Sequence, residues 1–230
     1  MAILELRDIY KSYDGEPVLD GITISLGRGE TIGIAGPNGC GKTTLLKIAA
    51  GIERPDRGTV AVKGTVALIP QDNLLLPWKT LRANIMLALK PLRLPPEEAE
   101  RRVEETAKLL SIEEYLNRYP RHVSGGTARK AAIARALVTS PDVLLLDEPY
   151  TGLDVAAVHA LRETLKSLAK SRRTSMIIVS HQIAELLGTV EKIYLLSHRP
   201  AKVTRVIETT THAAESVVNM LYTHGNERKT

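Results

Sequence analysis

The sequence reads Gly36-Pro37-Asn38-Gly39-Cys40-Gly41-Lys42-Thr43-Thr44 directly after an apolar run at residues 31–35 and directly before a helical pattern at residues 45–50. This stretch matches the spacing G-x-x-x-x-G-K-[ST], in which glycines let backbone N–H groups surround phosphates without side chains in the way. Lys42 would bring positive charge to the terminal phosphates, Thr43 would bring a hydroxyl to Mg²⁺, and the helix would add its dipole. The stretch therefore predicts a nucleoside-triphosphate site with residues 36–44 as its contacts.

The lone cysteine, Cys40, lies inside this loop. The dipole of the following helix would lower the Cys40 pKa, whereas bound phosphates would cover the thiol, so we do not expect a reactive cysteine. One cysteine excludes an internal disulfide, and the six histidines lack the spacing of a zinc site.

A second motif places two carboxylates after a buried strand. The apolar run at residues 143–146 is followed by Asp147 and Glu148. Burying carboxylates there is costly unless a cation or a proton compensates them. Asp147 would hold Mg²⁺, usually through water, and Glu148 would polarise the water that attacks a γ-phosphate. A surface turn with two carboxylates is the alternative, and the phosphate loop in the same chain weakens it.

A third motif, Val123-Ser124-Gly125-Gly126, precedes a helical pattern at residues 127–137. The exposed N–H groups at the start of that helix would form a second anion site. One chain has one phosphate loop, so our hypothesis is that this turn closes on the γ-phosphate bound by another copy of the chain, with ATP bridging a dimer. The residues alone leave open a helix capped by Ser124 and nothing more.

The composition is that of a soluble globular protein. The chain has 230 residues, of which 43% are hydrophobic and 25% charged, with a net charge of +5, and this excludes a disordered chain. The scattered basic side chains suit anions or a solvated surface equally. With one Trp, seven Tyr and no Phe, the core must be aliphatic, and an aromatic platform for nucleic acid is not expected.

We expect neither a secretory signal nor a membrane span. Residues 1–7 alternate apolar and charged side chains and lack the apolar core of a signal peptide. The longest apolar runs, such as residues 143–146 and 176–179, fall far short of the roughly 18 residues that a membrane helix needs. Any contact with a membrane would be made through a partner protein. The single cysteine suits a reducing compartment inside the cell.

Short β-branched runs alternate with helical patterns, which indicates an α/β fold around a mostly parallel sheet. Strands are predicted at residues 4–9, 22–26, 31–35, 59–62, 66–69, 143–146, 175–179, 193–196 and 202–207. Residues 73–138 lack buried-strand runs and predict a helical insertion. We expect a single domain over residues 1–230, with a frayed tail at residues 223–230.

Two apolar stripes predict helices that face the core. Pro95 and Pro96, followed by carboxylates, favour a helix start. The next apolar residues, at i, i+4 and i+7, are Val103, Ala107 and Leu110. The second stripe is formed by Val158, Leu161, Leu165 and Leu168.

Taken together, these motifs closely resemble the nucleotide-binding subunit of an ATP-binding cassette (ABC) transporter over nearly the whole chain. Walker A corresponds to residues 36–44, the signature to residues 123–127, Walker B to residues 143–147 with Glu148 beside it, and the D-loop to residues 151–154. Their order and spacing are highly specific. The resemblance implies an α/β P-loop NTPase with a mostly parallel core sheet, a small antiparallel β subdomain and a helical insertion.

The resemblance also implies roles for single residues. Tyr13 matches the aromatic residue on which adenine stacks, with Val18 nearby. Gln71 matches the Q-loop glutamine, which contacts Mg²⁺ and senses the membrane partner, and Asp154 belongs to the D-loop. His181 matches the switch histidine that bridges the γ-phosphate and the catalytic water region. Outside the family pattern, Tyr13 and Gln71 would be ordinary turn residues and His181 a capping histidine.

The signature departs from the usual Leu-Ser-Gly-Gly-Gln at both ends, where this chain has Val123 and Thr127. The phosphate-facing Ser124, Gly125 and Gly126 are intact, so we expect phosphate contact to be kept. Thr127 stands where the family signature has glutamine, and we do not assign the contacts of that glutamine to Thr127.

Two segments resemble the importer branch that handles nitrate, sulfonates and taurine. They are residues 71–78, followed by Asn84-Ile85, and residues 197–203, where Ala201 stands in place of a usual glycine. The interval between Walker A and Gln71 is short for the family, which implies a trimmed antiparallel β subdomain. The solute itself does not touch such a subunit, so the sequence does not identify it.

The resulting hypothesis is an ATPase that dimerises on MgATP and drives integral membrane permease subunits of an importer from the cytoplasmic side of the membrane. Its candidate catalytic residues are Glu148, His181 and Lys42. An extracytoplasmic solute-binding protein is implied as a partner, and nucleic acid is not. The alternative is a soluble ABC ATPase acting on nucleic acid or ribosomes, although a coiled-coil insertion or a second cassette would then be usual. A P-loop small-molecule kinase would lack the signature and the D-loop.

Overall fold

The computed structural model describes residues 1–172 and 174–209. The tail expected at residues 223–230 lies outside this part of the chain. No helix within the described ranges combines the length and the apolar character needed to cross a bilayer.

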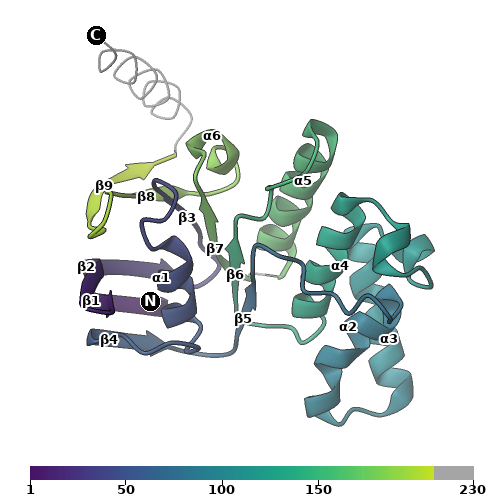
Figure 1. Ribbon diagram of the computed structural model, residues 1–230. Coiled ribbons are helices and arrows are strands. Elements are labelled where there is room, and N and C mark those ends of the chain that lie inside the picture. Colours follow the sequence, from purple (N-terminus) through teal and green to yellow (C-terminus); the bar gives the residue numbers. More distant parts are fainter. Residues whose placement is uncertain (173, 210–230) are drawn as a thin grey trace.

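The strands of the described residues form two β-sheets (Figure 1). Their strands are β1 (Ala2–Tyr13), β2 (Glu16–Gly27), β3 (Thr31–Ala35), β4 (Arg57–Val62), β5 (Val66–Ile69), β6 (Val143–Asp147), β7 (Ser175–Ser180), β8 (Lys192–Leu196) and β9 (Val203–Glu208). The smaller sheet is antiparallel, with the order β2-β1-β4. The larger sheet has the order β5-β6-β7-β3-β8-β9, in which the strands from β5 to β8 are parallel and β9 pairs antiparallel with β8.

Helices connect and cover these strands. The α-helices of the described residues are α1 (Lys42–Ala49), α2 (Leu81–Met86), α3 (Pro96–Leu110), α4 (Gly125–Leu137), α5 (Val155–Arg172) and α6 (Ile183–Leu186). Short 3-10 helices are η1 (Leu87–Leu92), η2 (Glu113–Tyr115) and η3 (Pro120–His122). In Figure 1, α2, α3 and α4 gather on one side of β5 and β6, and α1 and the smaller sheet lie on the other.

The central parallel strands are buried on both faces. Every residue of β3, β6 and β7 is buried, which explains their continuous apolar sequences. Because successive side chains point to opposite faces, Leu144 and Leu146 join a core with α3, α4 and α5, while Val143 and Leu145 join a core with α1 and the smaller sheet. Both faces of the sheet thus hold their covering elements by aliphatic contact.

The two predicted apolar stripes face the first of these cores. Val103, Ala107 and Leu110 in α3 and Leu165 in α5 are fully buried, and Val158 is partly buried against them. Each fully buried large aliphatic side chain contributes about 1.5–3 kcal/mol relative to an exposed one. The helical segments between β5 and β6 are therefore fastened to the sheet by apolar packing.

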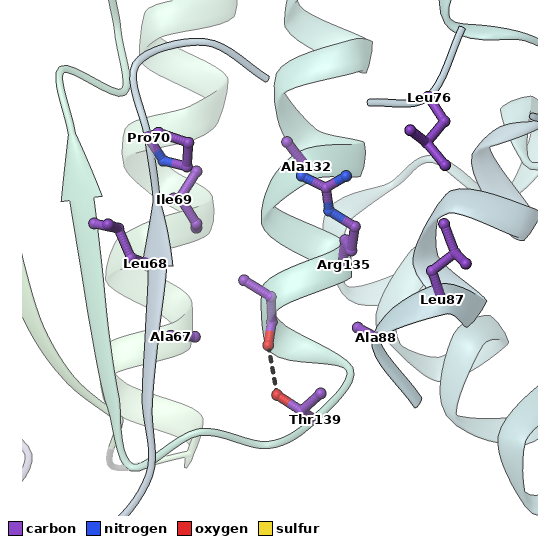
Figure 2. A pocket seen from close by; sticks show the side chains of 11 residues that line it. Ala67, Leu68, Ile69, Pro70, Leu76, Leu87, Ala88, Ala132, Arg135 and Thr139 are labelled. Carbon is purple, nitrogen blue, oxygen red and sulfur yellow. Dashed lines mark hydrogen bonds between the residues drawn. The ribbon is translucent and has the colours of Figure 1, made fainter. Parts of the chain in front are cut away.

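This packing leaves a groove at one seam. Between β5 on one side and α4 and η1 on the other lies a groove of about 470 Å³, shown in Figure 2. Much of its lining consists of small side chains, including Ala67, Ala88 and Ala132. Small side chains leave space between the edge of the sheet and the helical segments.

The N-terminal hairpin is longer than the sequence predicted. The strands expected at residues 4–9 and 22–26 extend to Ala2–Tyr13 and Glu16–Gly27. They meet at a turn in which Asp14 and Gly15 have φ of 50° and 82°. The residues next to this turn are largely polar and exposed, so they lack the apolar signal used for prediction. The other strands agree with their predicted bounds to within one or two residues.

Candidate nucleotide-binding site

Four loops meet at one edge of the larger sheet, where its parallel strands end. Residues 36–44 follow β3, Gln71 lies just after β5, Asp147 ends β6 ahead of Glu148, and His181 follows β7. Ligands of open α/β sheets bind outside the carboxyl ends of the strands. The topology therefore places motifs that are far apart in sequence at the position where this class of sheet binds ligands.

The phosphate loop requires glycine for both conformation and space. Gly39 and Gly41 have φ of 73° and 116°, in the left-handed region that other residues rarely adopt. A Cβ on Gly41 would lie 2.8 Å from side-chain atoms of Val18 and Leu19. Val18 is fully buried beneath the loop, where it supports Gly41. Its contact with a nucleotide base stays a prediction.

Lys42, the first residue of α1, turns its ammonium group back under the loop. Its Nζ donates hydrogen bonds to the carbonyl oxygens of Gly36 at 2.9 Å and Pro37 at 3.0 Å, and lies 3.7 Å from Glu148 Oε1. Lys42 is 6% exposed. A buried positive charge is thus held between the phosphate loop and the carboxylate that follows β6.

Thr43 and Asp147 form a pair that fits a divalent cation. Thr43 Oγ1 donates to Asp147 Oδ2 at 2.7 Å, while Asp147 Oδ1 is buried without a hydrogen-bond partner among the described residues. Burial raises the pKa of Asp147 because it disfavours the ionised carboxylate. Mg²⁺ prefers oxygen ligands of this kind. The donor set therefore fits Mg²⁺, and Thr43 and Asp147 would hold it.

Glu148 and His181 form the second pair. His181 Nδ1 lies 2.8 Å from Glu148 Oε2, and the Glu148 backbone N–H donates to the carbonyl of Val179 at 3.0 Å. Glu148 has φ of 44°, a conformation that is uncommon outside glycine and that often marks functional sites. With Lys42 facing its other oxygen, the carboxylate is oriented from two sides.

A hollow of about 190 Å³ unites most of these groups. It is lined by Asn38, Gly39, Gly41, Lys42, Thr43, Thr44, Gln71, Glu148 and Arg199. Arg199 was missed as a site residue by sequence reasoning, which used residues 197–203 only for their resemblance to one importer branch. A basic residue just after the parallel strand β8 was the signal available.

Tyr13 lies at the end of β1, outside the lining of this hollow. Its side chain is exposed, its hydroxyl donates to Glu53 Oε1 at 2.5 Å, and Lys11 Nζ stands 5.4 Å from the ring centroid. An exposed ring held by a hydrogen bond can stack with a base. The assignment of adenine to Tyr13 stays a prediction.

The signature turn and the D-loop do not join this hollow. Ser124 caps α4 by accepting a hydrogen bond from the Thr127 N–H at 3.2 Å, and Ser124 and Gly125 are exposed. Asp154 is also exposed and accepts a hydrogen bond from Ala157 N–H at 2.8 Å, at the start of α5. In Figure 1, α4 lies across β5 and β6 from α1. α4 thus lies apart from α1 (Figure 1), and none of Ser124, Gly125 and Asp154 lines the hollow.

The expectation that the helix dipole lowers the pKa of Cys40 was wrong. Cys40 is 2% exposed, and burial raises the pKa of its thiol despite the positive charge of Lys42. Desolvation of a thiolate outweighs the dipole here. Cys40 is a packed part of the loop.

A phosphate loop between a parallel strand and a helix, with a Thr–Asp pair and a Glu–His pair at the ends of neighbouring strands, defines a P-loop nucleotide-binding protein. The chain belongs to the ABC transporter family, whose model matches residues 19–151.

Similar proteins come from several transport systems. A spermidine/putrescine import ATP-binding protein of Legionella pneumophila is 34% identical over 207 residues, which are 85% of this chain and 57% of that protein. An sn-glycerol-3-phosphate import ATP-binding protein of Paracoccus denitrificans is 36% identical over 86% of this chain and 59% of its own length. An aliphatic sulfonates import ATP-binding protein of Shouchella clausii is 36% identical over 85% of this chain and 77% of its own length. This chain therefore spans little more than half of the first two relatives.

Solved structures of ABC cassettes share the fold. A dimeric bacterial ABC transporter cassette superimposes with a TM-score of 0.81 at 26% identity, covering 90% of this chain and 99% of that one. A post-hydrolysis dimer of the same cassette, bound to ADP and phosphate, gives 0.81 at 25% identity over 90% of this chain. A subunit of a Clostridium perfringens ABC transporter complex gives 0.82 at 26% identity, covering 99% of this chain and 96% of that one.

Proposed function

We propose that this chain is the ATP-binding and ATP-hydrolysing subunit of an ABC importer. The observation that carries the proposal is the convergence of buried Lys42, the Thr43–Asp147 pair and the Glu148–His181 pair at one edge of the sheet. Phosphoryl transfer to water needs charge neutralisation of the phosphates and an oriented nucleophile. These five residues supply both.

Each residue has a distinct part in the reaction. The backbone N–H groups of the loop at residues 36–44, except Pro37, and the Lys42 ammonium bind the terminal phosphates. Thr43 and Asp147 would hold Mg²⁺. When bound there, Mg²⁺ would supply neutralisation of the phosphate charge. Glu148 orients and polarises the attacking water, and His181 keeps the Glu148 carboxylate in position through their 2.8 Å contact.

The remaining candidates complete the site. Tyr13 stacks on adenine with Val18 beneath, and Gln71 would contact the ion and the partner subunit. Ser124, Gly125 and Gly126 act on the ATP held by a second copy, together with Asp154. Their separation from the Walker motifs of their own chain supports this arrangement. ATP therefore joins two copies in a homodimer with two composite sites.

The partners follow from this role. The dimer binds integral membrane permease subunits at the cytoplasmic face of the membrane, and the complete system includes an extracytoplasmic solute-binding protein. Leu74 and Trp78, which are 62% and 70% exposed just after Gln71, offer apolar surface to a permease. The solute is of the nitrate, sulfonate or taurine type, on the strength of residues 71–78 and the sulfonate importer relative.

Glu148→Gln tests the chemistry. The amide keeps the size of the side chain but cannot polarise water as a carboxylate does, so we expect hydrolysis to fall at least about 100-fold. ATP binding should persist, and MgATP should hold the variant as a long-lived dimer in size-exclusion chromatography. Normal turnover in this variant would overturn the role of Glu148.

Copurification tests the transport role. Tagged Glu148→Gln chain, extracted from membranes with MgATP, should carry a permease at equal stoichiometry, identified by mass spectrometry. A complex with ribosomes or nucleic acid and no membrane protein would leave the ATP chemistry in place and contradict transport.

A further inference from the structure

Arg129, on the second turn of α4, joins three parts of the nucleotide site. Its Nη1 donates to the carbonyl oxygens of Pro70 at 2.6 Å and Gln71 at 3.0 Å, and its Nη2 donates to the carbonyl oxygen of Asp147 at 3.0 Å. Its helix, α4, is the one that Ser124 caps. One guanidinium group thus links the signature helix to the main chain of the Q-loop and of Walker B.

Arg129 is buried, which is unusual for an arginine. The side chain is 3% exposed, and its nearest hydrogen-bond partners are neutral carbonyls. Burial lowers its pKa to about 10, partly offset by the charges of Asp147 and Asp72, so it remains charged at neutral pH. Among the described residues Arg129 forms no direct ion pair, and burying such an arginine is costly unless its hydrogen bonds compensate.

The seam that Arg129 crosses is loosely packed. Pro70, whose carbonyl it binds, and Ala132, one turn further along α4, both line the groove in Figure 2. Apolar contact is incomplete along this seam, so hydrogen bonds across it carry more of the alignment between α4 and the sheet. Arg135, on the same helix, bridges the seam further along, to the carbonyls of Leu74 and Asn73.

We propose that Arg129 is a positioning residue that sets the Gln71 and Asp147 main chain relative to the signature helix, and thereby aligns the two ends of a composite ATP site. This inference rests on the proposed ATP hydrolysis. Arg129 is not among the residues that line the nucleotide hollow, so it would act through the residues it holds. Its three carbonyl acceptors fix where Gln71 and Asp147 stand, while the same helix carries Ser124 toward the site of the other copy.

The decisive variants are Arg129→Met, which keeps apolar bulk but removes every donor, and Arg129→Lys, which keeps the charge and part of the donor set. We expect Arg129→Met to lower kcat for MgATP at least tenfold with KM for ATP within about threefold, and to raise the Mg²⁺ concentration for half-maximal activity. Arg129→Lys should recover part of each loss. Independently of activity, hydrogen exchange at the backbone amides of residues 71–76 should quicken in Arg129→Met and less so in Arg129→Lys.

Arg135→Met is the matched control, because it removes seam hydrogen bonds that do not reach Gln71 or Asp147. It should leave the Mg²⁺ dependence unchanged. Equal effects of Arg129→Met and Arg135→Met, or a kcat of Arg129→Met within twofold of wild type, would overturn the inference.

If circular dichroism shows that Arg129→Met does not fold, Arg129→Lys decides the question. An unaltered kcat and an unaltered Mg²⁺ dependence in Arg129→Lys would contradict the proposal. If the wild-type protein hydrolyses MgATP and these variants have the same kcat and Mg²⁺ dependence, only the inference about Arg129 is refuted. If the wild-type protein neither binds nor hydrolyses MgATP, the proposed function itself is refuted.

Discussion

Two helices of this protein begin with glycine-containing turns, and their N-termini are built in opposite ways. At α1, Gly41 is left-handed, has no side-chain cap and is crowded by Val18, and the first helical residue, Lys42, is buried. At α4, Ser124 caps the helix with its side chain, and a Cβ on Gly125 would meet nothing within 4 Å.

The difference shows how a helix N-terminus can bind an anion in two settings, within one chain and between two chains. Both helix starts offer N–H groups and a positive dipole to an anion. The first is enclosed by residues of its own chain and forms part of a hollow, whereas the second is presented outward. An enclosed start suits a ligand held by one chain, and an open start suits a ligand brought by another copy.

The largest effect is expected where the open start is given a negative charge. Gly125→Asp should lower steady-state hydrolysis about 100-fold, because a carboxylate at this helix start would repel the γ-phosphate that we propose it meets in the other copy. ATP binding to a single chain, measured by fluorescence titration, should change less than twofold. Gly125→Ala adds a Cβ in open space and is the control for the backbone. Loss of single-chain binding in Gly125→Asp would place the signature in its own chain's site.

The enclosed start should respond to the smallest possible side chain. Gly41→Ala combines a left-handed φ of 116° with a Cβ 2.8 Å from Val18 and Leu19, so we expect a loss of about 1–3 kcal/mol in the free energy of unfolding. Urea denaturation measures it. Gly125→Ala should cost little by comparison, and equal losses would remove the distinction between the two helix starts.

Arg199 extends the enclosed site beyond the motifs. Arg199→Ala removes a positive charge from the lining of the hollow and should raise KM for ATP by about three- to tenfold, an effect that weakens with salt. Lys202→Ala is the matched control, because Lys202 lies on the same loop but pairs with Asp20 at 3.0 Å. If both variants raise KM equally, the effect is one of overall charge.

The smallest effect is expected on thermal stability, when the buried carboxylate of Asp147 is removed. Burial raises the pKa of Asp147, so the folded state binds a proton more readily than the unfolded state, and stability falls as pH rises from 3.8 through the raised pKa. Asp147→Asn without Mg²⁺ should therefore raise Tm by about 2 °C at neutral pH, and the gain should shrink on acidification.

Asp142 gives the control of opposite sign. The hydrogen bond from the Thr65 backbone N–H lowers the pKa of Asp142, so the contribution of Asp142 to stability is present above pH 3.8 and is lost as pH falls. Asp142→Asn should lower Tm at neutral pH. Melting curves with a chelator at several pH values check both variants, and a Tm decrease in Asp147→Asn would contradict the cost assigned to burial.

Local patterns predicted most of the fold. The central strands were readable because parallel strands buried on both faces need continuous apolar residues, and α3 and α5 were readable from their apolar spacing. The hairpin turn at Asp14 was not, because its flanking residues are polar and are held by cross-strand pairing rather than by burial. The motif residues at the sheet edge followed from local spacing and from resemblance to a family.

The sequence by itself determined the chemistry of the phosphate loop, since glycine spacing, a lysine and a hydroxyl are local requirements of phosphate binding. It also determined that the central strands must be buried. Only the tertiary structure decided that Glu148 meets His181, that Cys40 is too buried to be activated, and that Arg129 and Arg199 reach the site. These contacts depend on which strands lie side by side and on how much water the packing excludes. A single motif determines neither the strand order nor the burial of its residues.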